Sequence, residues 1–366
     1  MKRCLGLIVL LAGTSFGAEP RAKNVILFLG DAGGIPTLNA ASIHGYREPR
    51  QLFIQKMPHI ALAETSSASR WVTDSAAGMT AIVTGHKTHN GVIAQSAAAV
   101  RGTKDGEPLK TILEYAEERG LSTGVISNSS VLSATPAACY AHVNDRKKES
   151  EILSQLLKPR FGDGVDVVIG HGRKGVLLAA EQAGQDAPTA LRKAGLVWYD
   201  SLDAIPIDAR RGVVLFDDDF DLDAATQRAI DVLSRNPKGF FLMVESDLHT
   251  EKVLQGLNRA VAVDKVIRRT AERMKSGDTL ILFTADHSYD FRVSGGPKGE
   301  PLLPVSTAAN FGDDQDSIRL GAVRREDDHT GEEVIVAAQG PGAERVRGFL
   351  ANTEVFHIMM SAFGWK

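Results

Sequence analysis

The sequence predicts an α/β protein with a doubly wound, mostly parallel central sheet and helices on both of its faces. Three observations support this class. Short runs of apolar, mostly β-branched or aromatic residues recur along the chain, as expected for strands covered on both faces. Segments with helical periodicity lie between them. Finally, acids and imidazoles follow several of these runs directly, where ligands bind in such sheets.

The strand candidates are spread over nearly the whole chain. They are Val25–Leu29, Ile60–Ala63, Gly124–Ser127, Val165–Ile169, Val213–Phe216, Phe240–Val244, Thr279–Thr284 and Val334–Ala338. The segment 288–328 contains Gly295-Gly296-Pro297 and Pro301 and is predicted to be an irregular surface excursion.

Helices are predicted where apolar residues share one face. Leu109, Ile112, Leu113 and Ala116 fit one helix that Gly120 ends. A longer one runs from Leu254 to Met274 and ends near Gly277. The acids at 217–223 suggest calcium, but the central glycine of a calcium loop is missing. They are interpreted more simply as complementing the dipole of a helix over Ala224–Leu233.

Length and composition indicate an ordinary globular protein. The 366 residues can bury a large core, and 43% are hydrophobic against 24% charged. A formal net charge of −3 argues against a nucleic-acid-binding role, which needs a basic face.

The N-terminus resembles a secretory signal. Lys2 and Arg3 precede the apolar stretch Leu5 to Ala12, and small residues follow around Ser15-Phe16-Gly17. We therefore expect residues 1–18 to be a signal peptide, residues 19–366 to form one catalytic domain, and the protein to be periplasmic or secreted. A retained N-terminal anchor is the alternative. No later segment is long and apolar enough for stable membrane insertion. Cys139 alone would remain after cleavage, so no internal disulfide is expected.

Ser75 is the candidate nucleophile. It lies in Thr73-Asp74-Ser75-Ala76-Ala77, a run that predicts the first turns of a helix. A helix start offers unpaired N–H groups and a positive dipole end, which suit an anion such as phosphate. Asp-Ser is equally an ordinary N-cap pair, so this motif alone does not decide between the two.

Candidate metal ligands follow three of the predicted strands. Asp31 follows the first, Glu245 follows Phe240–Val244, and Asp286-His287 follows Thr279–Thr284. Taken singly each residue has a structural explanation, but together at strand ends they indicate a site.

These residues carry a resemblance to the alkaline phosphatase family, the secreted metal-dependent phosphomonoesterases. The resemblance spans about residues 23 to 365. The matching segments are Lys23–Asp31, Thr73–Gly91, Pro108–Gly124, Ala134–Arg146, Asn236–Glu245, Thr284–His287 and His329–Gly342.

The resemblance implies a role for each site residue. Ser75 would become phosphorylated, and Arg146 would clamp two phosphate oxygens. One zinc ion would be held by Asp31, Asp286 and His287, and a second zinc by Asp247, His249 and His329. A magnesium ion would be held by Asp31, Thr135 and Glu245. The implied partners are small phosphate monoesters, and a homodimer is allowed, since relatives are commonly dimers.

Physical chemistry agrees with this allocation. A serine hydroxyl needs a base or a metal to become a good nucleophile. Zinc prefers mixed histidine and carboxylate sets, whereas a set of oxygen donors suits magnesium. A guanidinium matches two phosphoryl oxygens better than an ammonium does.

The sequence departs from the family between Glu245 and His249. Relatives place an aspartate five residues after the glutamate and a histidine four residues later, whereas here Asp247 and His249 are two apart. In an extended segment this spacing puts all three side chains on one side. Ser133 stands where many relatives carry an acid or histidine, and the lysine or histidine beside the second-zinc aspartate has no evident counterpart.

The other histidines have structural interpretations. His142, His171 and His357 lie in strand- or helix-like runs. His86 and His89 lie in a loop near the nucleophile and are interpreted as solvated, with contact to substrate as the alternative. The sequence thus predicts an exported zinc- and magnesium-dependent phosphomonoesterase. The alternatives are a phosphodiesterase or sulfatase of the same superfamily, and a catalytically silent metal- or phosphate-binding relative.

Overall fold

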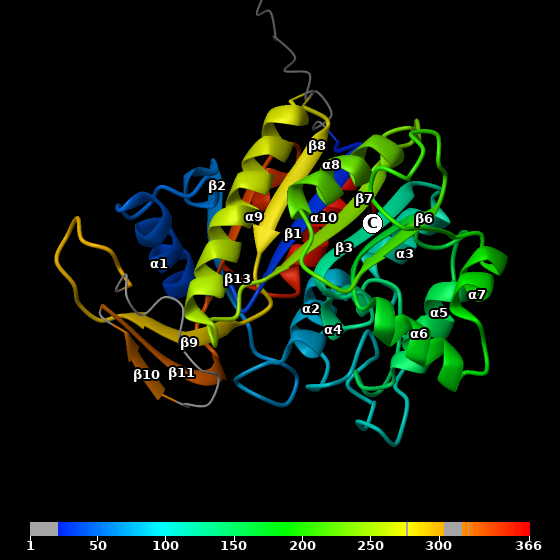
Figure 1. Cartoon of the computed structure of the whole chain (residues 1–366), viewed down its shortest axis with the longest axis horizontal. Helices are drawn as coiled ribbons and strands as arrows, with labels where there is room; N and C mark the ends of the chain where they lie inside the picture. The colour runs from blue at the N-terminus through cyan, green and yellow to red at the C-terminus, as the bar shows by residue number, and fades with distance from the viewer. Residues whose placement is uncertain (1–20, 276, 304–316, 321) are drawn as a thin grey trace, which may run out of the picture.

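A ten-stranded sheet forms the centre of the computed structural model, which describes residues 21–275, 277–303, 317–320 and 322–366 (Figure 1). Its strands follow the order β13-β2-β12-β8-β1-β7-β3-β4-β6-β5. In that order they are Gly348–Ala351, His59–Glu64, Val334–Gln339, Thr279–Thr284, Asn24–Asp31, Phe240–Asp247, Ser122–Ser130, Val167–His171, Gly212–Phe216 and Val197–Tyr199.

Seven of the nine neighbouring pairs are parallel, and β12 is antiparallel to both β2 and β8. The predicted mostly parallel sheet is therefore confirmed. All eight strand candidates are present. The short strands β5 and β13 were not predicted; they carry only three and four residues, too few for a clear pattern.

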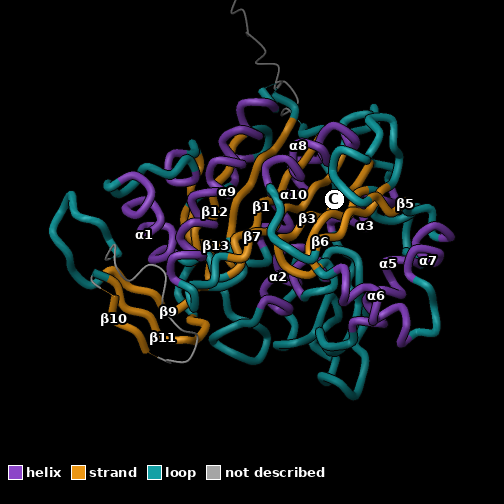
Figure 2. Tube along the Cα trace, in the orientation of Figure 1, coloured by secondary structure: helices purple, strands orange, loops and turns teal. Residues whose placement is uncertain are grey.

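Helices cover both faces of the sheet (Figure 2). Alternate residues of β1 explain this, because Val25 and Leu27 join one buried core and Ile26 and Phe28 join the other. One core includes residues of α1 (Ile35–Tyr46), α8 (Leu222–Leu233) and α9 (Val253–Arg273). The other includes residues of α2 (Ser75–Thr84), α3 (Ile112–Glu118), α4 (Ala134–Ala137), α5 (Glu149–Leu157), α6 (Arg173–Gln182), α7 (Ala187–Lys193) and α10 (Glu354–Phe363).

Local signals set the ends of several helices. Thr111 and Glu114 form a capping box at the start of α3, so the helix begins after Leu109 rather than at it. Asp221 caps α8 by accepting hydrogen bonds from the backbone N–H groups of Asp223 and Ala224. The capping interpretation of that acidic segment thus accounts for Asp221.

The segment predicted as an irregular excursion contains a second sheet. Strands β9 (Ser288–Val293), β10 (Ser317–Leu320) and β11 (Val323–Thr330) pair antiparallel in the order β10-β11-β9. Tyr289 and Phe291 are buried and alternate with less buried residues, a strand signal that the neighbouring glycines and prolines obscured. The sheet matters for function because β11 carries His329.

The expected signal peptide, residues 1–18, lies outside the described residues. Among the residues that the structure describes, no helix is both long and apolar enough to cross a membrane. Cys139 is a buried free thiol.

Candidate active site

Ser75 is the first residue of α2 and is 3% exposed. The preceding residue, Asp74, is the N-cap, and its Oδ1 accepts a hydrogen bond from the backbone N–H of Ala77 at 3.1 Å. At the other end, Gly85 adopts φ +73°, the left-handed conformation that ends many helices. The Asp-Ser pair therefore caps the helix and also places a buried hydroxyl at its positive end.

Three candidate ligands converge on Ser75 from two adjacent strands. Asp31 ends β1, while Asp286 and His287 follow β8, and β1 and β8 are parallel neighbours. Nε2 of His287 lies 3.2 Å from Oδ1 of Asp31, 3.7 Å from Oδ2 of Asp286 and 3.5 Å from Oγ of Ser75. These distances bring the three side chains together beside the serine.

The tautomer of His287 favours metal binding. Its Nδ1 lies 3.0 Å from the carbonyl oxygen of Ser288, and since a carbonyl can only accept, Nδ1 carries the proton. A histidine must be neutral to bind a metal, and in that state Nε2 presents its lone pair toward the carboxylates. Oδ1 of Asp31 and Oδ2 of Asp286 are buried without a hydrogen-bond donor. Buried carboxylate oxygens facing a bare imidazole nitrogen are a donor set that fits a zinc ion.

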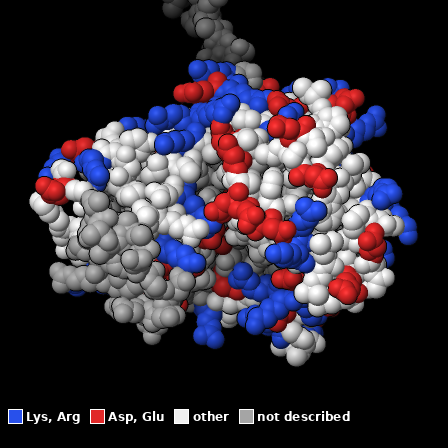
Figure 3. Space-filling view, viewed as in Figure 1, with Lys and Arg blue, Asp and Glu red and all other residues white. Residues whose placement is uncertain are grey.

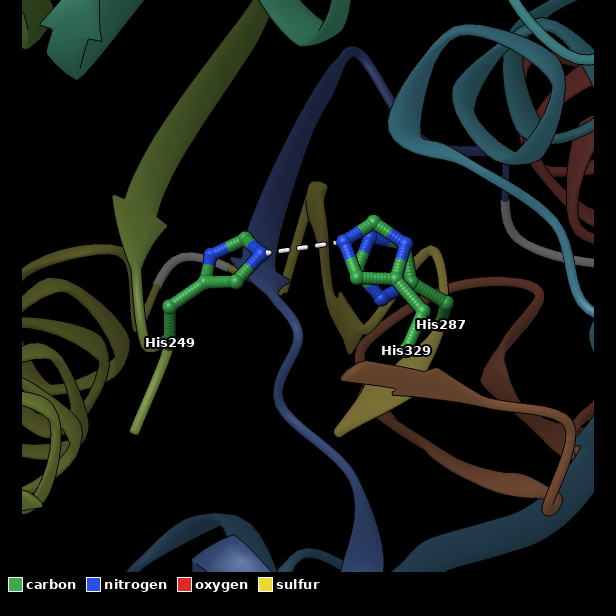
Figure 4. Close-up of side chains that lie close together, drawn as sticks. All are labelled: His249, His287 and His329. Atoms are coloured by element: carbon green, nitrogen blue, oxygen red, sulfur yellow. Dashed lines mark hydrogen bonds between the residues drawn. The ribbon is translucent and has the colours of Figure 1, made fainter. Parts of the chain in front are cut away.

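A second convergence involves His249 and His329 (Figure 4). Their Nε2 atoms lie 3.4 Å apart. Two nitrogens bound to a tetrahedral zinc ion at about 2.0–2.1 Å stand about 3.3 Å from each other. Nδ1 of His329 donates to the carbonyl oxygen of Thr73 at 3.2 Å, which again leaves Nε2 free of its proton. The two Nε2 atoms could therefore hold one ion between them.

Two groups in the described part of the chain have ligand atoms that all lie within 4.8 Å of one another. They are Asp31, Asp286 and His287, and His249, His287 and His329. Asp247, expected with His249 and His329, is in neither group. Its Oδ1 instead lies 2.8 Å from Nδ1 of His249, on the opposite side of that ring from Nε2.

Asp31, Thr135 and Glu245 are the three oxygen donors expected to hold the magnesium ion. Thr135, in α4, donates from Oγ1 to Oδ2 of Asp31 at 3.5 Å. Glu245, on β7, is fully buried and accepts a hydrogen bond from Ser127, while its Oε1 has no donor. Oxygen donors suit a magnesium ion, and the buried Oε1 of Glu245 has no hydrogen-bond donor. The three residues therefore fit the magnesium ion that the resemblance implies.

Arg146 lies beside the nucleophile helix. Its Nη1 donates to Oδ2 of Asp74 at 3.3 Å, and its backbone N–H donates to the carbonyl of Gly91 at 2.7 Å. Asp74 therefore contacts both the start of α2 and the guanidinium of Arg146. The charge of Arg146 is also one of those that lower the pKa of Asp31.

The acids of the site repel one another when no ion compensates them. Burial raises the pKa of Glu245 well above its usual range, and the neighbouring charge of Asp31 adds to this. Burial and Asp31 likewise raise the pKa of Asp286 to about 6. Burial opposes ionisation of Asp31 too, but the charges of His249 and His287 outweigh it and lower its pKa.

The pKa values of His249 and His329 shift in opposite directions. Burial alone would lower the pKa of His249, but Asp31 and Asp247 raise it to about 10. Burial and the neighbouring His287 lower the pKa of His329 to about 4. A concentration of buried, mutually perturbed groups is typical of a functional site.

Sequence reasoning missed several residues that support the site. Arg259, in α9, pairs with Asp247, Ser127 bonds Glu245, and Asn128 accepts from the backbone N–H of Asp247. Arg259 places a guanidinium beside Asp247. Arg259 lies twelve residues after Asp247, within helix α9. That separation in the sequence does not indicate a contact between the two side chains.

The remaining histidines lie outside these groups. His142 is buried between Glu114 and the carbonyl of Ala94, as its structural interpretation expects. His89 bonds the carbonyl of Ala97, and His86 is exposed in the loop after α2.

The family model described as alkaline phosphatase matches residues 22–203 and 217–318. The chain belongs to the alkaline phosphatase family. It is 30% identical over 437 residues to an alkaline phosphatase of Gadus morhua, an alignment that covers 93% of this chain and 92% of that protein. It is 29% identical to the tissue-nonspecific isozyme of Homo sapiens, covering 93% and 83% of the two chains.

Solved structures agree with the family fold. The alkaline phosphatase of the Antarctic bacterium TAB5 aligns with a TM-score of 0.76 at 24% identity, over 95% of this chain and 99% of that one. The enzyme of Thermus thermophilus aligns with a TM-score of 0.77 at 20% identity, over 98% and 96%. A variant of the TAB5 enzyme, with a TM-score of 0.77 at 25% identity over 95% and 99%, has Mg bound in its M3 site. Membership makes this chain a phosphoesterase-type hydrolase of a metal-dependent family.

Proposed function

We propose that this protein is an exported phosphate monoester hydrolase that acts through a phosphoserine at Ser75. The observation that carries the proposal is the position of the Ser75 hydroxyl. Its Oγ lies 3.5 Å from Nε2 of His287, the atom that also faces Asp31 and Asp286. A buried serine at a helix start, opposite a set of metal ligands, is suited to attack a bound phosphoryl group.

Each residue contributes a defined part of the reaction. The first-turn N–H groups of α2 and the guanidinium of Arg146 orient the phosphoryl oxygens, and Ser75 attacks phosphorus in line with the leaving oxygen. Asp31, Asp286 and His287 would hold one zinc, His249 and His329 a second, and Asp31, Thr135 and Glu245 a magnesium. Ions bound at these places would stabilise the negative charge on the serine alkoxide and on the leaving oxygen. They would also lower the pKa of a water molecule for the second half-reaction.

A monoester is the favoured substrate because Arg146 can clamp two of three free oxygens. A diester presents fewer oxygens to the guanidinium and the metals. The test is a comparison of kcat/KM on an aryl phosphate, a bis-aryl phosphate and an aryl sulfate. The proposal expects the aryl phosphate to react fastest; faster turnover of the diester or the sulfate would favour the corresponding rival of the same superfamily.

A silent metal- or phosphate-binding relative remains the alternative of a different class, motivated by the shortened 245–249 segment. Acid quenching during turnover followed by mass spectrometry separates the two. The proposal expects a phosphoryl group on the peptide that carries Ser75. A protein that retains metal yet forms neither phosphoserine nor product would be the silent binder.

Export, the metal stoichiometry and a homodimer belong to the same proposal. Processing after residue 18 in a secreting host, elemental analysis and the mass in solution test them separately.

A further inference from the structure

Both oxygens of the Asp247 carboxylate are engaged by neighbouring protein groups. Oδ1 accepts from the backbone N–H of His249 at 3.1 Å and lies 2.8 Å from Nδ1 of the same residue. Oδ2 accepts from Nη1 of Arg259 at 3.0 Å. Because a carboxylate can only accept, Nδ1 of His249 is the donor in its contact.

The ring of His249 separates Asp247 from the second ion's place. Nε2 faces His329, as Figure 4 shows, whereas Asp247 lies at Nδ1. Oδ1 of Asp31 also lies near Nδ1, at 3.7 Å, which is longer than the 2.8 Å contact of Asp247. The two nitrogens of an imidazole point about 144° apart, so an ion bound at Nε2 would stand about 6–7 Å from that carboxylate oxygen, against about 2.0–2.2 Å for a zinc–oxygen bond. Asp247 cannot bind that ion without giving up its present contacts.

Arg259 fixes Asp247 in this orientation from the helix side. Besides the contact with Asp247, its Nη2 lies 3.6 Å from Oδ1 of Asp219, in the acidic loop before α8. The backbone N–H of Asp247 donates to Oδ1 of Asn128 at 2.7 Å, which holds the end of β7 as well. Figure 3 shows acidic and basic side chains gathered around a hollow near the middle of the face in view.

The short spacing accounts for the arrangement. β7 ends at Asp247, so Glu245 and Asp247 lie on the same side of the strand, as the spacing predicts. His249 follows two residues later and folds back over Asp247, which leaves the carboxylate behind the ring.

We infer that Asp247 and Arg259 are a positioning pair for His249, and that the second zinc ion is held by the imidazoles of His249 and His329 without the Asp247 carboxylate. This inference rests on the proposed function, since it concerns the metal site of the same reaction. Carboxylates that accept from the distal nitrogen of a metal-bound histidine fix its tautomer and orientation.

The test uses the full mature protein, stripped of metal and titrated with Zn²⁺ and, separately, with Co²⁺. Asp247→Asn keeps an oxygen that accepts from Nδ1, so we expect the same metal stoichiometry as the wild type and an unchanged visible spectrum of bound Co²⁺. Asp247→Leu removes the acceptor and should weaken binding at this site by about 10- to 100-fold without removing it. His249→Ala should lose one equivalent outright.

Arg259→Gln gives an independent check that leaves every proposed ligand in place. We expect the stoichiometry to persist and the affinity at the His249 site to fall by less than in Asp247→Leu. Circular dichroism of each metal-free variant establishes that it is folded.

The inference is overturned if Asp247→Asn loses one equivalent as His249→Ala does, or if its Co²⁺ spectrum changes as expected for a lost ligand. Wild-type protein that takes up no divalent ion at all would overturn the proposed function as well, so the two failures are distinguishable.

Discussion

The two carboxylate oxygens of Asp74 make different contacts, and two substitutions can distinguish what each contact contributes. Its Oδ1 caps α2 through the N–H of Ala77, and its Oδ2 accepts from Arg146. Loss of an N-cap side chain costs about 1 kcal/mol, within a range of about 0.5–2 kcal/mol. A partly exposed ion pair contributes about 0.2–1 kcal/mol. We therefore expect Asp74→Ala to lower the free energy of unfolding by roughly 1–2 kcal/mol.

Asp74→Asn is the matched control, because asparagine caps a helix as well as aspartate does but carries no charge for Arg146. Its free energy of unfolding should fall by less than about 1 kcal/mol. Both variants lose the ion pair, so in both the affinity for inorganic phosphate as an inhibitor should weaken by about two- to fivefold.

The assays are urea unfolding of the metal-free protein and product inhibition of the metal-loaded enzyme. Equal destabilisation by the two substitutions would show that the cap does not hold the helix start. Unchanged phosphate inhibition in both would show that Asp74 does not position Arg146.

Four further outcomes are expected. Ser75→Ala should remove nearly all turnover while metal content, measured by elemental analysis, stays at the wild-type level; wild-type turnover would refute the covalent route. Arg146→Lys should raise KM for an aryl phosphate, because an ammonium cannot clamp two oxygens, and an unchanged KM would remove Arg146 from substrate binding. Chelation should lower the thermal midpoint of unfolding, because the buried acids of the site then lack a compensating positive charge. Adding back Zn²⁺ and Mg²⁺ should restore the midpoint, and a midpoint insensitive to chelation would contradict the metal site. Burial raises the pKa of Glu117 from 4.5 to about 8 in the folded protein, so between these pH values folding takes up a proton. The free energy of unfolding therefore falls as pH rises through this range, by up to about 1.4 kcal/mol per pH unit. Glu117→Gln should flatten that decline in urea unfolding measured from pH 5 to 8, and an unaltered slope would assign it to other groups.

Much of the architecture follows from local sequence. Strands covered on both faces leave continuous apolar runs, which is why the central strands were predicted with nearly their observed bounds. Their carboxyl ends carry the candidate site residues, so the sequence alone places Asp31, Glu245 and the pair Asp286-His287 at one edge of the sheet.

What sequence could not supply is contact between distant elements. β9 and β11 were missed because their buried alternation is short and lies beside glycine and proline. The antiparallel direction of β12 depends on the path of the connection, not on its own residues. The orientation of Asp247 depends on Arg259, whose place in α9 only the packing of that helix against β7 reveals.

The most direct test of the account is anomalous diffraction at the zinc edge from crystals of the metal-loaded protein. Two peaks are expected about 3.5–4 Å apart. One should lie within bonding distance of Asp31, Asp286 and His287 and beside Oγ of Ser75, and the other at Nε2 of His249 and His329. Peaks away from these atoms, or no ion beside Ser75, would contradict the central claim that these distant residues hold metals around one serine.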